Sequence, residues 1–215
     1  MLLLVALAAA MDLARVPPPA AVTPAVTPAV TPAVAVATPV APPPAYAPAG
    51  APTAKYPAPI ITAARAYLGR EYKWAGRDET LDCMGLVFRA WTDVTGQPWQ
   101  ELSENPTELV AARALGAPVP GLDGVLAEHI DWSLLRSGDV VFFLSRVPNP
   151  VEPALAVLGG EPHWVRHMAL YEGDLLRRFI AGEHTKGEVS ELPLPGYLEV
   201  WRVWYQGIYV VRPGT

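Results

Sequence analysis

Hydrophobic positions divide the chain into three stretches with different patterns. Up to residue 59, apolar residues alternate with prolines in low-complexity sequence. From residue 60 they recur every three or four residues, as on one face of a helix. After residue 137 they gather in short apolar runs, which favour β-strands. Helices first and strands afterwards predict an α+β domain, with N-terminal helices packed on an antiparallel β-sheet.

The second of the predicted helices has the clearest boundaries. Asp82 is a suitable N-cap, Gly96 lies beyond the last apolar position, and Cys83 falls in the first turn. We expect one face of this helix to pack on the sheet. Its apolar stripe consists of Leu86, Val87, Ala90, Trp91 and Val94.

Two shorter helices are predicted on either side of it. Residues 60–68 carry apolar side chains at helical spacing, and Gly69 is placed to end that helix. Asn105 followed by Pro106 is a start signal for a third helix over residues 107–115.

Four apolar runs predict the strands. They cover residues 140–144, 164–171, 175–181 and 207–211. The sequence Glu-Gly-Asp at residues 172–174 is typical of a tight turn, so the second and third strands should form a hairpin.

Composition predicts three regions. Residues 1–16 begin with MLLLVALAAA, an apolar run ending in small residues that predicts a signal peptide. Residues 17–59 hold more than half of the 25 prolines and repeat AVTP, which predicts a stiff, disordered linker without a partner. A tether that lets a catalytic domain reach through or along a wall is the less favoured alternative. Residues 60–215 should form one folded domain. We therefore expect an exported protein, in the periplasm, the cell envelope or outside the cell, without a stable membrane span after signal cleavage.

Charge and cysteine content narrow the function further. The formal net charge is −5, and Lys and Arg form no dense run, so the sequence offers no basic surface for nucleic acid. The single cysteine excludes an internal disulfide. In an exported protein such a thiol is either a buried bystander or a working group. A monomer is expected.

Cys83 is placed to react. A thiol attacks as its thiolate, and the N–H groups and dipole at a helix N-terminus lower the pKa of a thiol there. A buried structural cysteine is the alternative. Its neighbours Asp82 and Gly85 favour the reactive interpretation.

A general base must come from another part of the chain, which contains four histidines: His129, His163, His167 and His184. His167 is the best candidate because a side chain in the middle of a strand is held rigidly. Strand alternation puts it on one face with Val165, Ala169 and Tyr171. His163 precedes the strand in a Gly- and Pro-rich loop and should be exposed. A zinc site of His163, His167 and His184 is disfavoured, because a histidine pair at i, i+4 is a zinc motif of helices, whereas the surrounding residues favour a strand.

Four segments in order resemble a known family. They are ARAYLGREYKWAGR (residues 64–77), DCMGLVFRAW (82–91), LLRSGDVVFF (134–143) and HMALYEGD (167–174). In the same order, they are similar to four motifs of the NlpC-type cell-wall peptidases: the Trp-Gly-Gly segment, the Asp-Cys-Ser-Gly-Leu nucleophile motif, the Pro-Gly-Asp-Leu strand and the His-Val-Gly-Ile-Tyr-x-Gly strand. These are papain-like cysteine hydrolases of bacteria.

The resemblance implies a papain-like NlpC-type domain and a reaction. Cys83 would attack an amide carbonyl, and His167 would take the thiol proton and return it to the leaving amine. Tyr72 would lie near the oxyanion, and Asp82 would face the amine end of the substrate. Family members usually cleave peptides of peptidoglycan, often next to D-glutamate. No metal and no organic cofactor is implied.

Two positions depart from the family pattern. Met84 replaces the serine after the nucleophile, which removes a hydroxyl from the substrate-binding region. Ala181 stands where a polar residue would orient the base. Glu183 should share the face of Ala181 and could substitute, as could a backbone carbonyl, whereas His184 would need a bulge to turn inward.

The leading hypothesis is an exported cysteine peptidase or amidase acting on peptidoglycan stem peptides. An acyltransferase or deamidase with the same Cys-His pair is one alternative. A catalytically silent wall-binding domain is another, suggested by Met84 and Ala181.

Most tryptophans are expected to serve packing. Trp91 belongs to the apolar stripe of its helix, and Trp201 with Trp204 should pack a C-terminal segment. A face of aromatic residues that binds glycans is the less favoured alternative.

Overall fold

A computed structural model describes residues 58–214. The predicted signal peptide and nearly all of the predicted linker lie outside the described residues. The elements are α1 (Pro59–Arg65), α2 (Cys83–Thr95), α3 (Pro106–Ala111), β1 (Ala117–Leu126), β2 (Val140–Ser145), β3 (Ala156–Leu158), β4 (Glu161–Tyr171), β5 (Arg178–Glu183), β6 (Glu188–Pro193), α4 (Leu194–Val200) and β7 (Gly207–Arg212). No helix among residues 58–214 is long and apolar enough to cross a bilayer.

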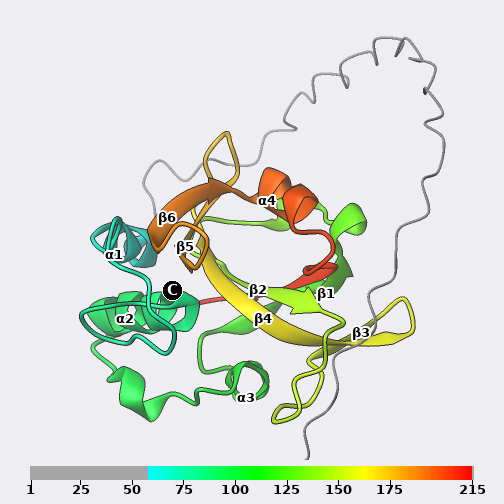
Figure 1. Cartoon of the computed structure of the whole chain (residues 1–215), viewed down its shortest axis with the longest axis horizontal. Coiled ribbons are helices and arrows are strands. Elements are labelled where there is room, and N and C mark those ends of the chain that lie inside the picture. The colour runs from blue at the N-terminus through cyan, green and yellow to red at the C-terminus, as the bar shows by residue number, and fades with distance from the viewer. Residues whose placement is uncertain (1–57, 215) are drawn as a thin grey trace, which may run out of the picture. The chain divides into compact units, whose positions relative to one another are not determined.

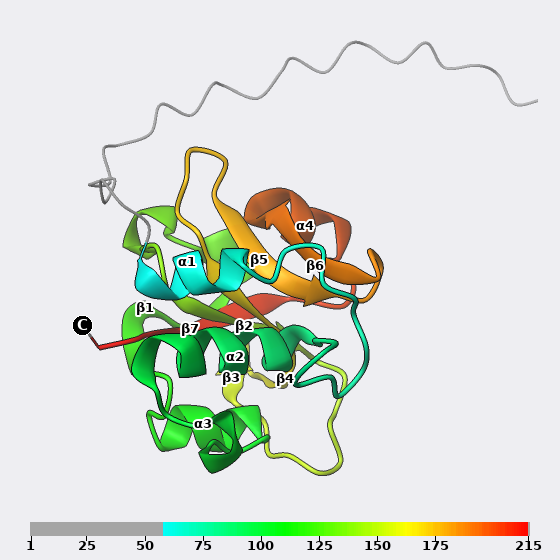
Figure 2. The same cartoon turned by 90° about the vertical axis from the view of Figure 1, so that its left-hand side faces the viewer.

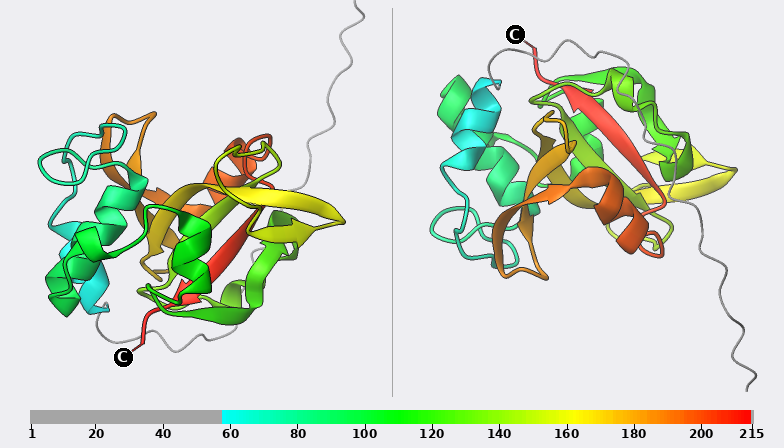
Figure 3. Two further views of the ribbon diagram at one scale, coloured as in Figure 1. Left: turned by 90° about the horizontal axis from the view of Figure 1, so that it is seen from below. Right: turned by 90° about the horizontal axis from the view of Figure 1, so that it is seen from above.

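The strands form one antiparallel sheet in the order β1-β7-β2-β4-β5-β6, and β3 pairs with the outer part of β4. The N-terminal helices α1 and α2 lie together on one side of this sheet (Figures 1 and 2). The views in Figure 3 show α4 on the other side. The predicted α+β arrangement is confirmed.

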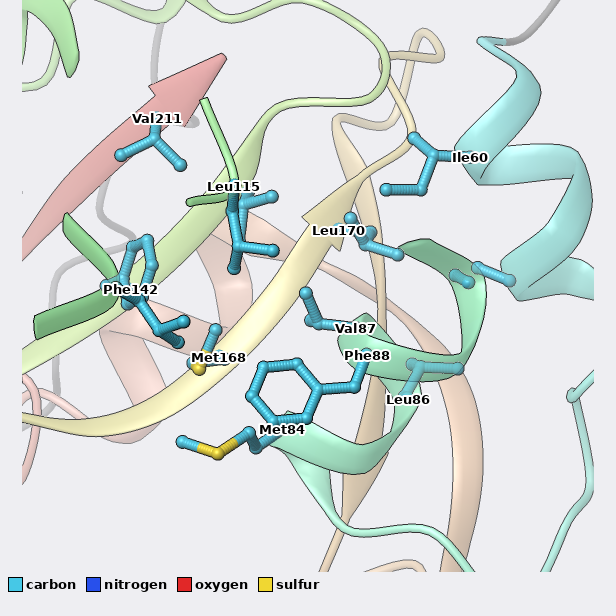
Figure 4. Close-up of a cluster of buried hydrophobic side chains, with 14 of the residues drawn as sticks. Ile60, Met84, Leu86, Val87, Phe88, Leu115, Phe142, Met168, Leu170 and Val211 are labelled. Atoms are coloured by element: carbon cyan, nitrogen blue, oxygen red, sulfur yellow. The ribbon is translucent and has the colours of Figure 1, made fainter. Parts of the chain in front are cut away.

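Two hydrophobic cores lie on the two faces of the sheet. The helix-side core joins α1 and α2 to the sheet, and Figure 4 shows Leu86, Phe88, Phe142 and Met168 within it. The α4-side core lies under α4 and contains the alternate strand residues, such as Phe143. Because each central strand contributes to both cores, the sheet is held rigidly between them.

Helix α2 has the predicted boundaries. The Asp82 carboxylate accepts a hydrogen bond from the backbone N–H of Gly85 (2.7 Å), and Gly96 ends the helix in the left-handed conformation (φ 73°). The buried face differs slightly from the predicted stripe, because Phe88 is fully buried whereas Val94 is 44% exposed.

The other two helices are shorter than predicted. α1 ends at Arg65, because the following residues turn away and the N–H of Gly69 bonds to the carbonyl of Val189 in β6 (2.9 Å). Leu68 is consequently exposed. α3 ends at Ala111, and Arg113 adopts a left-handed conformation (φ 52°) that a continuing helix excludes.

The connection from β4 to β5 is wider than the predicted tight turn. Asp174 accepts hydrogen bonds from the backbone N–H groups of Leu176 and Arg178, which organises a loop over residues 172–177. β5 therefore starts at Arg178, and Leu175 is 87% exposed. The predicted antiparallel pairing of the two strands is confirmed.

Candidate active site

A β-bulge in β4 decides which way His167 points. Phe143 of β2 pairs with His167, while the next residue, Leu144, pairs with Val165. Arg166 is therefore an extra residue in the ladder. The side chain of Val165 lies in the helix-side core, whereas His167 points to the α4 side, so their predicted common face is wrong. The bulge reverses the alternation between them.

Beyond the bulge the prediction holds. Ala169 and Tyr171 lie in the α4-side core, on the face to which His167 points. The imidazole is buried, at 7% exposure, and its ring lies 5.2 Å from the ring of Phe143. The middle of the strand thus holds His167 rigidly.

The start of α2, at Cys83, packs against β5 beyond the residues that pair β5 with β4. Their pairing covers Leu170 with Ile180 and Tyr171 with Phe179. Further along β5, the backbone of Gly182 packs against the start of α2, and a Cβ there would lie 3.0 Å from the nitrogen of Cys83. A glycine is therefore required for this close approach.

The sulfur of Cys83 lies beside the strand that carries His167. Backbone N–H groups of Met168 and Met84 interact with the sulfur and favour its anion, and Met168 directly follows His167. The fold thus brings the first turn of α2 and the middle of β4 together.

The pKa of Cys83 is opposite to the expectation. Burial raises the pKa of this thiol to about 12, and the negative charge of Asp82 raises it further. The backbone N–H groups of the helix start and Arg77 lower this pKa, but their effect is smaller. The N–H at the helix start thus acts in the predicted direction, and burial outweighs it.

The imidazole of His167 is shifted toward its neutral form as well. Burial lowers the pKa of His167 to about 4, although the charges of Glu183 and Asp82 raise it. At neutral pH the free protein therefore holds a neutral thiol and a neutral imidazole.

Glu183 is the carboxylate that faces His167. Its side chain lies at the end of β5 with the residue only 3% exposed, and its Oε2 atom is 3.7 Å from Nε2 of His167. The hydroxyl of Tyr197 donates a hydrogen bond to the same oxygen (2.8 Å), and the N–H and hydroxyl of Thr185 donate to Oε1 (3.2 and 3.0 Å). These donors fix the carboxylate in place.

His184 lies away from this position. It is exposed in the turn after β5, and its ring meets the edge of Tyr72 at 5.7 Å. Of the two side chains proposed to orient the base, the structure brings Glu183 to His167 and leaves His184 outside.

Two tyrosines that the sequence analysis did not single out enclose the imidazole. Tyr205 stacks on His167 at 6.1 Å with an interplanar angle of 19°, and Tyr197 stacks on it at 6.0 Å and 30°. Within the described residues, Nε2 of His167 has no hydrogen-bond partner. The rings therefore shield the base from water.

Tyr72 lies near the nucleophile, as the resemblance implies. It is half-buried, and its backbone N–H donates to the carbonyl of Gly187 (2.8 Å). Burial raises the pKa of Tyr72 to about 12, and the charge of Cys83 adds to this increase. Its hydroxyl is a neutral hydrogen-bond donor at physiological pH.

Asp82 and Met84 are engaged within the protein. The Asp82 carboxylate accepts from the N–H of Ala75 (3.0 Å) and from Arg77 (2.6 Å) in addition to its capping bond. Met84 is buried in the helix-side core (Figure 4), and its sulfur accepts a weak hydrogen bond from Arg77 (3.5 Å). Both side chains support the start of α2.

His163 differs from its prediction. It belongs to β4 and is 1% exposed, because β3 pairs with this part of the strand and covers it. Its Nδ1 lies 2.8 Å from the carbonyl oxygen of Glu161. Among residues 58–214, no three His, Cys, Asp or Glu side chains are arranged to hold a metal ion.

A surface groove of about 290 Å³ adjoins the site. It is lined by Val147, Arg166, Trp201, Trp204 and Tyr205. Trp201 packs partly on the α4-side core, as predicted, but Trp204 is 55% exposed. The prediction that Trp204 serves packing is therefore wrong.

No protein-family model matches the sequence, and no curated protein matches it. Solved structures match its fold. An N-acetylmuramoyl-L-alanine amidase from Bacteroides uniformis is 12% identical, with a TM-score of 0.54 over 73% of this chain and 98% of the amidase.

Two further solved structures are similar at lower TM-scores. The NlpC/p60 domain of the peptidoglycan hydrolase SagA is 17% identical, with a TM-score of 0.43 over 72% of this chain and 96% of that domain. The peptidoglycan hydrolase RipB from Mycobacterium tuberculosis is 20% identical, with a TM-score of 0.42 over 72% of this chain and 62% of RipB.

These identities are too low to transfer a reaction, and they concern the fold alone. The amidase match extends over nearly the whole of that protein and over most of this one. The expected α+β fold is confirmed, and it is the fold of this amidase.

Proposed function

We propose that this protein is an exported cysteine hydrolase that cleaves amide bonds in peptidoglycan stem peptides. The observation that carries the proposal is the buried pair of the His167 imidazole and the Glu183 carboxylate, with the sulfur of Cys83 beside the backbone N–H of Met168, the next residue of β4. A nucleophile, a base and a buried acceptor behind the base are the parts of a thiol hydrolase. The fold shared with a peptidoglycan amidase supports the choice of substrate.

The first half of the reaction forms an acyl-enzyme. Because Nε2 of His167 faces Glu183, the other ring nitrogen, Nδ1, takes the thiol proton as the sulfur bonds to the amide carbonyl. Collapse of the tetrahedral adduct breaks the C–N bond, and the same proton passes to the leaving amine. The carbonyl remains bound to sulfur as a thioester.

Water completes the reaction. His167 accepts a proton from the water that attacks the thioester, the C–S bond breaks, and the thiol regains its proton as the acid product leaves. The substrate carbonyl gains one oxygen from that water. No oxidant, metal or organic cofactor is needed for this balance.

Glu183 has an electrostatic role in this scheme. The imidazole becomes positively charged during both halves, in a site where burial disfavours that charge. A carboxylate 3.7 Å from Nε2 stabilises the imidazolium and holds the ring with Nδ1 toward the sulfur. The distance is longer than a hydrogen bond, and we expect it to shorten when substrate binds.

The proposed division of the chain follows the sequence analysis. Residues 1–16 are the export signal, residues 17–59 a linker, and residues 60–215 the catalytic domain, acting as a monomer at the cell wall. An acyltransferase or deamidase would use the same groups on another acceptor or amide.

One observation favours the catalytically silent alternative. A thiol with a pKa of about 12 is almost entirely protonated at neutral pH, so Cys83 is inert until a base removes its proton. In that alternative the domain binds the wall without cutting it.

Digestion of purified sacculi distinguishes the proposed hydrolase from the catalytically silent domain. The full-length protein should release new amino groups and soluble fragments, and mass spectrometry of the fragments identifies the bond. Cys83→Ser and His167→Ala should each lower this release by at least about a hundredfold. Val203→Ala, on an exposed residue, is the control. No release by the parent above the level of Cys83→Ser, together with binding of both proteins to sacculi, would establish the silent alternative.

A further inference from the structure

The two oxygens of the carboxylate beside His167 have different partners. Oε1 of Glu183 accepts hydrogen bonds from the N–H and the hydroxyl of Thr185 (3.2 and 3.0 Å), two residues further along the chain. Oε2 is the oxygen that lies 3.7 Å from Nε2 of His167, and it accepts a hydrogen bond from the hydroxyl of Tyr197 (2.8 Å). Within residues 58–214, Tyr197 is thus the side chain that donates to the oxygen facing the base.

The ring of Tyr197 is held on several sides. The residue lies in α4 and is 8% exposed. Its ring meets the edges of Phe143 (5.4 Å) and Phe179 (5.0 Å), and it stacks on His167 at 6.0 Å. Because these contacts involve the ring, a phenylalanine at this position keeps them and loses the hydroxyl alone.

The hydroxyl of Tyr197 helps Glu183 to keep its charge. Glu183 is only 3% exposed, so the bonds from Tyr197 and Thr185 replace those that water would make to a free carboxylate. Without the tyrosine hydroxyl, Oε2 faces the imidazole and has no other donor among the described side chains. A proton on Oε2 is then favoured, because a buried carboxylate that has lost a donor is less stable.

The charge of Glu183 in turn decides which nitrogen of His167 carries the proton. A neutral imidazole has one N–H and one lone pair, and the group facing Nε2 selects between the two arrangements. A carboxylate accepts from Nε2–H and leaves the lone pair on Nδ1. A carboxylic acid does the reverse: its O–H donates to Nε2, the proton of the ring lies on Nδ1, and Nδ1 is no longer a base.

We propose that Tyr197 is a positioning residue: by bonding to Oε2 of Glu183 it keeps the proton of the neutral imidazole on Nε2 and the lone pair on Nδ1. The inference rests on the proposed function and adds a residue to it. The thiol proton of Cys83 then moves to Nδ1, while Nε2 keeps its own proton next to the carboxylate. Nδ1 later passes its proton to the leaving amine, so the imidazole returns to its starting form.

NMR locates the proton without any substrate. The pKa of His167 is about 4, so its ring is neutral at pH 7. Long-range ¹H–¹⁵N spectra of the full-length, ¹⁵N-labelled protein distinguish N–H from lone-pair nitrogens, and the signals of His167 are those missing from His167→Gln. We expect the proton on Nε2 in the parent and its transfer to Nδ1, in part or completely, in Tyr197→Phe.

Tyr67→Phe is the matched control for the loss of a tyrosine hydroxyl. That hydroxyl donates to the carboxylate of Asp93 (2.6 Å), near the end of α2 opposite Cys83, and its removal should leave the proton of His167 in place. A parent protein with the proton on Nδ1 would overturn the proposal, and this result needs no variant. A proton that stays on Nε2 in Tyr197→Phe would overturn it as well.

Kinetics test whether the role passes through Glu183. Tyr197→Phe should lower kcat on a soluble muropeptide by about ten- to a hundredfold with little change in KM, because fewer molecules then hold a usable base. In a Glu183→Gln background, which lacks the carboxylate charge, the same substitution should cost less than about twofold. Equal losses in the two backgrounds would show that Tyr197 does not act through Glu183, and no loss in either would remove it from the mechanism.

The two measurements fail separately for Tyr197 and for the proposed function. If the proton moves in Tyr197→Phe but the parent hydrolyses neither muropeptides nor sacculi, the hydrolase is refuted and Tyr197 still sets the form of the imidazole. If the parent hydrolyses muropeptides and the proton does not move, the role of Tyr197 is refuted and the hydrolase stands.

Discussion

The Nε2 atom of His167 lies 3.7 Å from the Oε2 atom of Glu183, and both side chains are almost completely buried. A full negative charge next to a neutral imidazole in a buried site is useful when that imidazole gains a proton. A substitution that keeps the shape of Glu183 but removes its charge should therefore weaken the pair's ability to hold that proton.

Glu183→Gln should lower kcat by about a hundredfold or more with little effect on KM, because the imidazolium loses its counter-charge while the substrate site is unchanged. The amide oxygen can still accept the hydrogen bond from Tyr197. Steady-state kinetics on a soluble muropeptide measure the effect, and circular dichroism checks the fold. An unchanged kcat would remove Glu183 from the mechanism.

Asp82→Asn should make Cys83 more reactive. The charge of Asp82 raises the pKa of the thiol, so its removal lowers that pKa and increases the thiolate fraction at any pH below it. Asparagine caps a helix as well as aspartate does, so the hydrogen bond from Gly85 can remain. We expect alkylation by iodoacetamide at pH 8 to accelerate roughly three- to tenfold.

Because the chain has one cysteine, the alkylation rate reports on Cys83 alone. Asp78→Asn is the matched control, since Asp78 is exposed and pairs with Arg89. A slower reaction of Asp82→Asn than of the parent would contradict the predicted sign.

Acid should destabilise the protein through His167. The pKa of this imidazole is about 4 in the folded protein and near 6.5 when unfolded, so the unfolded chain binds more protons between these values. The contribution to stability is complete above pH 6.5 and is lost as the pH falls toward 4. Between pH 7 and pH 5 the loss from this group should be about 2 kcal/mol.

Urea unfolding at the two pH values, followed by tryptophan fluorescence, measures this loss. His167→Gln lacks the titrating group, so the free energy of unfolding of this variant should fall by about 2 kcal/mol less than that of the parent. The same pH dependence in both proteins would show that other groups are responsible.

Ala75→Gly should stabilise the protein. Ala75 is exposed and has a left-handed backbone (φ 58°), while its N–H donates to Asp82 and ties the preceding loop to α2. The left-handed conformation costs a non-glycine residue about 1 to 2 kcal/mol, and the added freedom of glycine in the unfolded chain offsets about half of this. The net gain should be about 0.5 to 1 kcal/mol in urea unfolding. Ala75→Val should be destabilising, and a destabilised Ala75→Gly would argue against strain at this position.

Much of the fold follows from local signals in the sequence. Asp82 and Gly96 define α2 because capping depends on residues next to each other in the chain. β2 and β7 were recognisable from their continuous apolar runs. β1 was missed because prolines and glycines interrupt its pattern, and pairing with β7 along one edge stabilises it nonetheless.

The chemistry was less predictable because it depends on contacts between distant residues. The motifs around Cys83 and His167 predict the proposed pair, and alternation from Ala181 predicts that Glu183 faces His167, where the structure places it. The pKa shift of Cys83, in contrast, comes mainly from desolvation by the surrounding fold, which no local pattern reports. Tyr197 and Tyr205 reach His167 from the C-terminal segment, and their spacing in sequence carries no sign of this contact.

The bulge at Arg166 has a consequence for how this strand can vary. In a regular strand residues 165 and 167 would share a face, and the extra residue between them puts their side chains on opposite faces. Replacing the arginine leaves the bulge in place. Deleting it would give a regular ladder in which Val165 and His167, then adjacent in sequence, still point to opposite faces. The bulge thus absorbs one extra residue of β4 without turning the imidazole away from its carboxylate.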